Sequence, residues 1–344
     1  MSPPTQTRIA VLGRHMQMSA RRLCAAATLS LCAIAANADA QNEDDGLLRR
    51  GGFPYGAFER ADRIQLRLGE GSLEVAFAPG ELDLARGEIL EWVEQSARAV
   101  VVYYGTLPDP RARVLIVPVA GRGVRGGTSY GHYGAATRIE LGRASTRQDL
   151  ERDWVLVHEL VHHAFPMLAD EHHWLEEGLA TYVEPIARAQ AGGLSEEKVW
   201  RDLVEGLPNG LPDAGDRGLD RTPTWGRTYW GGALFCLLAD IEIRERTGNR
   251  KGLQDALRAV VAAGGRISRS WNIARALEVG DDATGVTVLA DLYARMRHAP
   301  APVDLEHLWA RLGVQRNGSQ MRMSDDAPLA AIRRAITGAY DGGG

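Results

Sequence analysis

The chain has 344 residues, of which 45% are hydrophobic and 24% charged, and its formal net charge is −4. Acidic and basic residues are mixed along the chain without long runs of one sign. This pattern argues against a protein that binds nucleic acid or an anionic membrane surface. The length and hydrophobic content fit one catalytic unit with a small appended region.

The N-terminus has the organisation of a secretory signal peptide. Arg21 and Arg22 precede an apolar run over residues 23–36, and Ala38-Asp39-Ala40 forms a small-x-small cleavage signal. The run is too short to span a membrane comfortably. We therefore expect removal of residues 1–40, export to the periplasm or the extracellular space, and no stable membrane insertion afterwards.

An anchored form of the exported chain is the alternative. Cys32 could carry a lipid, although Leu31 stands where a small residue is preferred, and the uncleaved apolar run could act as an anchor. Cleavage would leave Cys236 as the one cysteine, in an apolar helical pattern where it is expected to be a buried hydrophobic residue. Residues 41–57, polar and glycine-rich, are expected to form a flexible leader.

The segment after the leader predicts a small sheet with one long helix. Residues 64–68 and 73–77 show the period-two alternation of strands around a glycine turn, and residues 81–104 show the spacing of a helix. Residues 114–119 read as a buried strand. A glycine-rich stretch then leads into residues 138–141, for which we predict a short edge strand.

A second helix is expected to begin near residue 146, because Thr146 with Asp149, or Ser145 with Gln148, can form a capping box. Apolar residues then recur every three or four positions until Pro166 ends the run. These apolar residues are Leu150, Trp154, Val157, Val161 and Phe165.

This helix carries two histidines four residues apart, His158 and His162, with Glu159 between them. Residues four apart lie on one face of a helix, so both imidazoles can bind a single Zn²⁺. Glu159 would then lie beside the reacting water and act as the general base. The alternative is an ordinary amphipathic helix with solvated histidines, but burying these polar groups beside an apolar stripe without a partner is costly.

A catalytic zinc usually has three protein ligands and one open position. Residues 174–184 read WLEEGLATYVE, and this string after a helical HExxH resembles the gluzincin metallopeptidases, in particular the aminopeptidase N and glycyl aminopeptidase branch. In that branch the glutamate directly before the glycine is the third ligand, so the resemblance places this role on Glu177. Glu176 is the alternative, but it would point about 100° away on a helix. The fourteen residues between His162 and Glu177 form a shorter spacer than the aminopeptidase N pattern has.

The segment RTYWGGAL at residues 227–234 is similar to the Y-x-x-G-A-L string of the same families. There the tyrosine hydroxyl stabilises the oxyanion of the tetrahedral intermediate, so the resemblance assigns this role to Tyr229. A phenol suits it because it donates a hydrogen bond without being charged at neutral pH. The resemblance covers roughly residues 110–245. It implies one Zn²⁺ per chain and a peptide or protein substrate.

The chain departs from aminopeptidase N in the glycine-rich stretch at residues 126–134. Aminopeptidase N carries there a G-x-M-E-N string whose glutamate holds the substrate's amino group, whereas this stretch contains no carboxylate. Endopeptidase and aminopeptidase activity therefore both stay open. The strand can still align a peptide by backbone pairing. The residues expected to bind substrate are Gly127, Thr128, Ser129 and Tyr130, whereas His132 and Tyr133 are at least as well explained by packing.

Other polar residues near the two helices have less specific roles. His163 should face away from His162 and lie on the surface or behind a ligand, and His172 and His173 are expected to be loop residues. Glu184 is seven residues after Glu177 on the same helix face and could accept a hydrogen bond from a zinc-bound histidine. Residues 126–134 lack a carboxylate to hold the substrate's amino group, and a carboxylate from elsewhere in the chain could take this role. The candidates are Glu176, Glu184, Asp213, Asp216 and Asp220.

The rest of the chain predicts a long loop at residues 206–226 and then helices. These helices are expected at residues 233–246, 252–263, 268–278, 284–296 and 303–312. The expected fold class is α+β, with a small N-terminal sheet and a helical C-terminal lobe. The resemblance implies that the core is that of a thermolysin-like zinc peptidase. The core is expected to span residues 58–250 and the lobe residues 251–340. The expected function is that of a secreted zinc peptidase, and the alternative is an inactive relative that binds peptides or cell-wall components.

Overall fold

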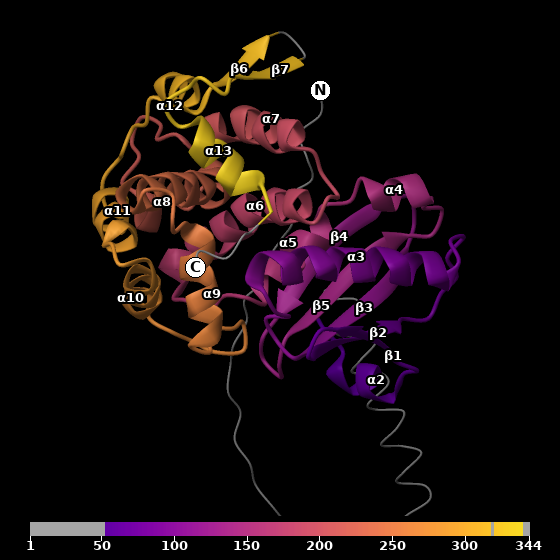
Figure 1. Ribbon diagram of the computed structural model, residues 1–344. Helices are drawn as coiled ribbons and strands as arrows, with labels where there is room; N and C mark the ends of the chain where they lie inside the picture. The colour runs from indigo at the N-terminus through magenta and orange to yellow at the C-terminus, as the bar shows by residue number, and fades with distance from the viewer. Residues whose placement is uncertain (1–51, 318–319, 340–344) are drawn as a thin grey trace, which may run out of the picture. The chain divides into compact units, whose positions relative to one another are not determined.

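The computed structural model describes residues 52–317 and 320–339 (Figure 1). The chain divides into two compact units, residues 1–61 and residues 62–344. The described part of the first unit contains the short helix α2 (Tyr55–Arg60), so the end of the expected flexible leader includes the start of a helix. The predicted signal peptide lies outside the described residues.

The second unit contains a five-stranded sheet with strand order β1-β2-β3-β5-β4. The pairs β2–β3 and β3–β5 are parallel, and the two outer pairs are antiparallel. The two strands predicted at residues 64–68 and 73–77 are confirmed. The strands are β1 (Ile64–Leu68), β2 (Gly71–Phe77), β3 (Arg111–Val119), β4 (Val124–Tyr130) and β5 (Ala136–Gly142).

The prediction of an edge strand at residues 138–141 is wrong. This segment belongs to β5, which lies between β3 and β4, and the glycine-rich β4 forms the edge. The physical reason is burial: Ile139 and Leu141 are fully buried, as are Val114 and Ile116 of β3, whereas no residue of β4 is. Strands buried on both faces take central positions, and a glycine-rich strand suits an edge.

Helix α3 (Arg86–Tyr104) crosses one face of this sheet (Figure 1). It begins five residues later than the start predicted at residue 81, because the Glu88 carboxylate accepts the backbone N–H of the N-cap residue Ala85. Its buried side chains, among them Ile89, Trp92 and Val93, pack into the core.

The helix predicted from residue 146 to Pro166 is divided into α4 (Arg147–Glu151) and α5 (Val155–His162). The capping box of Thr146 with Asp149 forms, and the alternative with Ser145 does not, because the Ser145 hydroxyl donates to the carbonyl of Gly142. Asp153 causes the division, since its carboxylate accepts the first N–H groups of α5, at 3.0 and 3.1 Å. Trp154 was expected to be buried, but it is 53% exposed.

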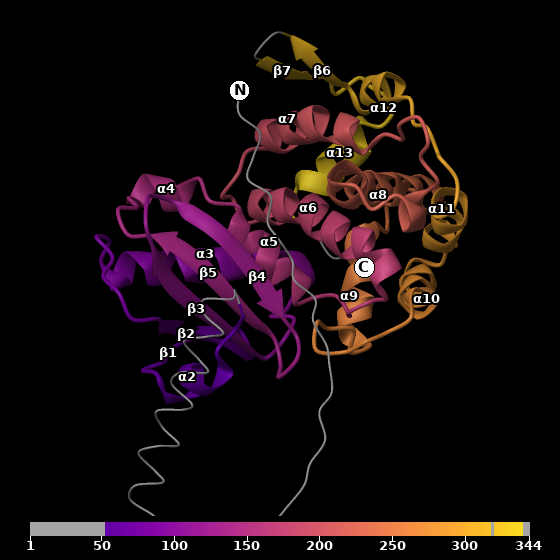
Figure 2. The same cartoon turned by 180° about the vertical axis from the view of Figure 1, so that it is seen from behind.

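Helix α6 (His173–Gln190) follows, and the remaining chain is mostly helical, as predicted (Figure 2). Four of the five predicted C-terminal helices begin within about four residues of the expected positions, and α10 begins five later. A two-stranded hairpin and helix α13 were not predicted. The elements are α7 (Glu196–Gly206), α8 (Gly232–Thr247), α9 (Leu253–Ala262), α10 (Ile273–Thr284), α11 (Val288–Met296), α12 (Leu305–Leu312), β6 (Val314–Asn317), β7 (Gln320–Met323) and α13 (Ala330–Thr337).

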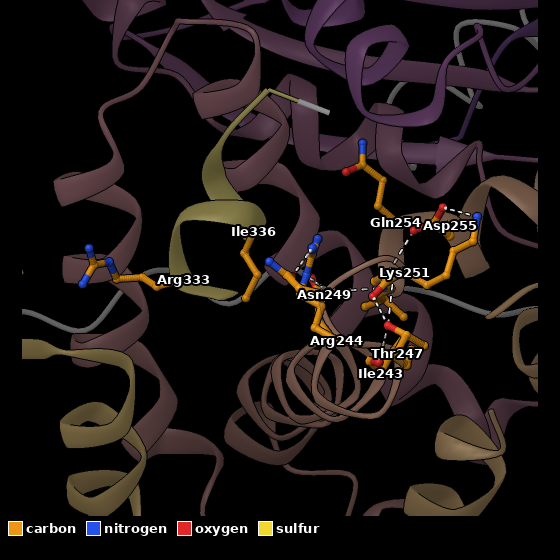
Figure 3. A network of polar contacts seen from close by, with 12 residues as sticks. Ile243, Arg244, Thr247, Asn249, Lys251, Gln254, Asp255, Arg333 and Ile336 are labelled. Carbon is orange, nitrogen blue, oxygen red and sulfur yellow. Dashed lines mark hydrogen bonds and ion pairs between the residues drawn. The ribbon is translucent and has the colours of Figure 1, made fainter. Parts of the chain in front are cut away.

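A polar network joins the end of α8 to the start of α9 (Figure 3). Buried Asp240 accepts hydrogen bonds from Arg244 on α8, from the Leu253 backbone and from Tyr182 on α6. Gln254 donates to the carbonyl of Tyr103 at the end of α3. Because buried carboxylates are costly unless paired and hydrogen-bonded, this network fixes α6 relative to the helices around it.

The mixed α+β fold, with its small N-terminal sheet and helical C-terminal part, is therefore confirmed. Within the described ranges, no helix combines the length and apolar character that a membrane crossing requires. Cys236 is buried in α8 as a free thiol, as expected.

Candidate metal centre and active site

Two helices bring three potential metal ligands together. His158 and His162 come from α5, and Glu177 lies in the second turn of α6. Glu177 Oε2 is 3.2 Å from His158 Nε2 and 3.7 Å from His162 Nε2. All three ligand atoms lie within 4.8 Å of one another, so the structure groups the ligands that the sequence analysis selected.

The charges of these ligands suit a cation. Burial alone would raise the pKa of Glu177, but the imidazoles of His162 and His158 outweigh it and lower this pKa to about 2. Burial lowers the pKa of His162 to about 4. At neutral pH the group therefore offers a carboxylate and at least one neutral imidazole, which are the protonation states that bind metals.

The donor set and its spacing fit zinc. Two histidines and one glutamate are the ligands of a common class of catalytic zinc sites. Two ligand atoms that are each about 2.0–2.1 Å from a tetrahedral ion lie about 3.4 Å apart. The distances of 3.2 and 3.7 Å from Glu177 to the two imidazoles are close to that value.

Glu159 lies between the ligand pair and the edge strand β4. A Cβ on Gly127 would stand 2.6 Å from Glu159 Cγ, so only glycine lets the strand approach this side chain. The Ser129 hydroxyl donates to the backbone carbonyl of Glu159 at 2.7 Å. Burial raises the pKa of the Glu159 carboxyl to about 7, against the opposing effect of His158. A carboxyl with such a pKa can both take up and return a proton near neutral pH.

Tyr229 lies in a single π-helical turn, Gly226–Gly231, directly before α8. Such turns are rare and often occur at functional sites. Its ring is 6.4 Å from the ring of His158, between centroids, and nearly parallel to it. Burial and the carboxylates of Glu177 and Glu159 raise the pKa of the Tyr229 hydroxyl, so it stays protonated and able to donate.

The predicted substrate residues of β4 divide between the two faces of the sheet. Gly127 and Ser129 face α5, where Ser129 also contacts Thr137, so its hydroxyl supports the helix. Because side chains alternate along a strand, Thr128 and Tyr130 belong to the opposite face. The backbone of β4, rather than these side chains, is thus the part that can meet a substrate.

The alternative ligand Glu176 is engaged elsewhere. It accepts the backbone N–H of Leu168 at 2.7 Å and contacts His173 Nδ1 at 3.0 Å. His173, expected in a loop, is the first residue of α6, and its Nε2 lies 3.4 Å from Glu177 Oε1. Glu176 and His173 therefore support the third ligand from behind.

Burial and polar contacts give the positions of three further residues for which the sequence predicted roles. His163 is 1% exposed and contacts the Thr137 hydroxyl at 2.8 Å, so a surface position is wrong for it. His172 lies in a short 3₁₀ turn, where it is buried and contacts Asp220 at 3.0 Å. Glu184 pairs with Arg188 at 2.8 Å, and among the described residues no hydrogen bond joins it to His158.

Two exposed tryptophans lie beside the site and were not predicted from the sequence. Trp154 packs edge-on against His158 with 5.6 Å between ring centroids, and Trp225 lies 6.2 Å from Tyr229. Both side chains are more than half exposed. Large apolar side chains left open at a polar centre commonly contact ligands. The only sequence signal was that each stands within four residues of a selected residue.

We expect Ala substitution of His158, His162 or Glu177 to weaken zinc binding by on the order of 100-fold or more, because each change removes a ligand. Glu176→Ala is the matched control on the neighbouring position and should retain zinc. Zinc content after dialysis against a chelator measures both. Loss of zinc in Glu176→Ala with retention in Glu177→Ala would make Glu176, and not Glu177, the third zinc ligand.

No protein-family model matches the chain, and no curated protein matches it in sequence. Among solved structures, an aminopeptidase N family protein from Idiomarina loihiensis has a TM-score of 0.58 and 14% identity, over 74% of this chain and 49% of that one. An M1 zinc metallopeptidase from Deinococcus radiodurans has a TM-score of 0.46 and 20% identity, over 70% of this chain and 52% of that one. The chain spans about half the length of these structures. The first similarity shows that this chain shares the fold of the matched half of an aminopeptidase N family protein, in line with the sequence resemblance.

Proposed function

We propose that the chain is a zinc-dependent peptidase with a thermolysin-like gluzincin core. The observation that carries this proposal is the convergence of His158, His162 and Glu177 with Glu159 beside them. Zinc analysis and digestion of a peptide library by the purified protein test it. Zinc binding without cleavage of any peptide would favour the alternative, an inactive relative that binds peptides.

The three ligands would hold one Zn²⁺, which supplies Lewis acidity toward water and the scissile carbonyl. Glu159 takes the proton from the attacking water and returns it to the leaving amine. Tyr229 donates its hydroxyl hydrogen to the oxyanion that develops on the carbonyl. The edge of β4 aligns the peptide by backbone pairing, next to Glu159.

Tyr229→Phe should lower kcat on the order of 100-fold and change KM little, because the hydroxyl acts mainly in the transition state. Steady-state kinetics on a single peptide measures the two parameters. A wild-type kcat in Tyr229→Phe would give the oxyanion role to another group.

The engagement of four of the five carboxylates that could hold a substrate amine supports an endopeptidase. Glu176 and Glu184 have the partners described above. In the loop before Tyr229, Asp216 forms a buried ion pair with Arg227 at 2.8 Å. Asp220 accepts hydrogen bonds from Trp174 and Tyr293, and its side chain is 2% exposed. Of the five candidates, Asp213 alone has no such partner in the described structure.

We therefore expect N-terminal acetylation of a peptide to leave its cleavage rate about unchanged, with internal bonds among those cut. Without a carboxylate placed to hold it, an α-ammonium gains no favourable interaction in the cleft, so a free terminus brings no advantage. Mass spectrometry of matched peptides with and without the acetyl group gives the rates and the bonds. Loss of cleavage on acetylation would make the protein an aminopeptidase.

We further propose that the protein acts after export, in the periplasm or the extracellular space. The arginine pair, apolar run and Ala38-Asp39-Ala40 string support this proposal. Fractionation of expressing cells and N-terminal sequencing of the exported form test it, with Gln41 as the expected first residue.

A further inference from the structure

Beyond the end of β4 lies a cavity of about 590 Å³ whose charge opposes that of the whole chain. Four arginines line it, while Asp109 is its one acidic residue, and the whole chain carries −4. The cavity is thus a concentration of positive charge in an acidic protein. The arginines are Arg111, Arg113, Arg266 and Arg269.

The arginines differ in how far the protein itself uses them. Arg113 donates to the backbone carbonyl of Tyr133 at 2.8 Å and so holds the turn that forms one wall. Arg266 and Arg269 form no ion pair among the described residues, and the buried Nε of Arg266 has no hydrogen-bond partner there. Unpaired guanidinium groups in a concave site are the groups that bind carboxylates, often with two parallel hydrogen bonds.

Two of the three segments that line the cavity continue from the proposed active site, and the third is residues 109–113 around the start of β3. One wall, Gly131–Gly134, directly follows β4. The other wall contains Arg266 and Arg269, and its backbone bonds the segment after α5: Ile267 donates to His163, and Met167 donates to Arg269. A Cβ on Gly131 would overlap the carbonyl of Ile267, so the two walls touch at this glycine. The cavity therefore lies beyond the C-terminal end of the strand that would align a peptide.

The residue positions along β4 give the distance between the cavity and Glu159, the proposed general base. Gly127 contacts Glu159, and the cavity begins at Gly131, four residues further along. At about 3.3 Å per residue this is a path of about 13 Å. Antiparallel pairing is the more stable arrangement per residue, and it directs the N-terminal half of a bound peptide toward the cavity.

We propose that this arginine cavity binds an acidic side chain of the substrate, about four residues to the N-terminal side of the scissile bond. The inference rests on the proposed peptidase function. It makes the protein an endopeptidase that selects Asp or Glu at a remote position through Arg266 and Arg269.

Matched peptides that differ only in Glu or Gln test this, with the residue moved one position at a time on either side of the scissile bond. The wild-type protein should cleave the peptide with Glu at about the fourth N-terminal-side position with a KM about five- to tenfold lower than that of its Gln counterpart. kcat should be unchanged, because the contact is the same in the ground state and the transition state. Glu on the C-terminal side should bring no advantage.

The double variant Arg266→Gln, Arg269→Gln should lose this preference while it cleaves the Gln peptide like the wild type. Arg143→Gln is the matched control, since Arg143 is exposed and lies beyond the opposite end of β4. It removes one charge of the same sign and should retain the preference. Equal KM values for the Glu and Gln peptides in the wild type, or a preference that survives the double variant, would overturn the proposal.

Two further measurements separate this proposal from neighbouring ideas. In the Glu159→Gln background, fluorescence anisotropy of a labelled Glu or Gln peptide reports binding without cleavage, so a failure of the peptidase proposal and a failure of the cavity proposal give different results. Inorganic phosphate is then compared with chloride at equal ionic strength. Selective competition by phosphate alone, with no Glu preference, would show a site for a free anion and contradict a substrate subsite.

Discussion

Glu159→Gln should retain zinc and lose turnover by about three to four orders of magnitude. The amide has the size and polarity of the carboxyl but cannot accept a proton from the attacking water, and general-base catalysis contributes up to about 10⁴-fold. The ligands His158, His162 and Glu177 are unchanged, so the metal should stay. Zinc content and kcat, measured on the same sample, check both halves of the expectation.

The environment of Glu159 makes this substitution a clean test. The side chain lies against Gly127, and the backbone carbonyl of Glu159, which the substitution leaves in place, accepts the Ser129 hydroxyl. A matched control is Glu140→Gln on β5, which changes a half-buried carboxylate that pairs with Arg138 at 2.7 Å. It should leave kcat near the wild-type value. Simultaneous loss of zinc and turnover in Glu159→Gln would mean that Glu159 is a ligand or a structural residue.

The chemistry of the site could be predicted from the sequence because it depends on short spacings. Two histidines four residues apart lie on the same face of a helix in any tertiary structure. His158 and His162 could therefore be predicted as a ligand pair from the local sequence alone. Glu177 and Tyr229 are distant in sequence, and only the resemblance of their flanking strings selected them. The structure brings Glu177 into the group and places the Tyr229 ring near His158.

Features that depend on tertiary packing could not be predicted in this way. The order of β5 and β4 depends on which strand is covered on both faces, and the alternation of a short strand does not reveal that. The break before α5 depends on Asp153, whose carboxylate caps the helix although the apolar spacing continues past it. The arginine cavity combines residues more than 150 positions apart, so no local pattern could indicate it.

The glycines of the two resemblance strings have a common physical explanation, which predicts a second large effect. Gly178 on α6 directly follows Glu177, and Gly232 on α8 lies three residues after Tyr229. A Cβ on Gly178 would overlap the backbone of Gly232, and a Cβ on Gly232 would overlap the carbonyl of Trp174. The two helices therefore touch backbone to backbone at the point where each presents a residue to the site.

Gly178→Ala should therefore destabilise the protein by about 3 kcal/mol or more, at the upper end of overpacking effects, because neither backbone can move aside as a side chain would. Chemical denaturation with a chelator present measures this without the contribution of bound zinc. Gly87→Ala is the matched control: Gly87 lies in the first turn of α3, and a Cβ there meets no atom within 4 Å. That substitution should stabilise the helix by up to about 1 kcal/mol.

The same substitution should also weaken the metal site, because separating α6 from α8 moves Glu177 away from the two imidazoles and changes its distance to Tyr229. Gly178→Ala protein that remains folded should thus bind zinc more weakly than Gly87→Ala protein, although no ligand has been changed. A Gly178→Ala variant with wild-type stability and wild-type zinc affinity would show that the α6–α8 contact is looser than this structure indicates, and that the glycine after Glu177 has another purpose.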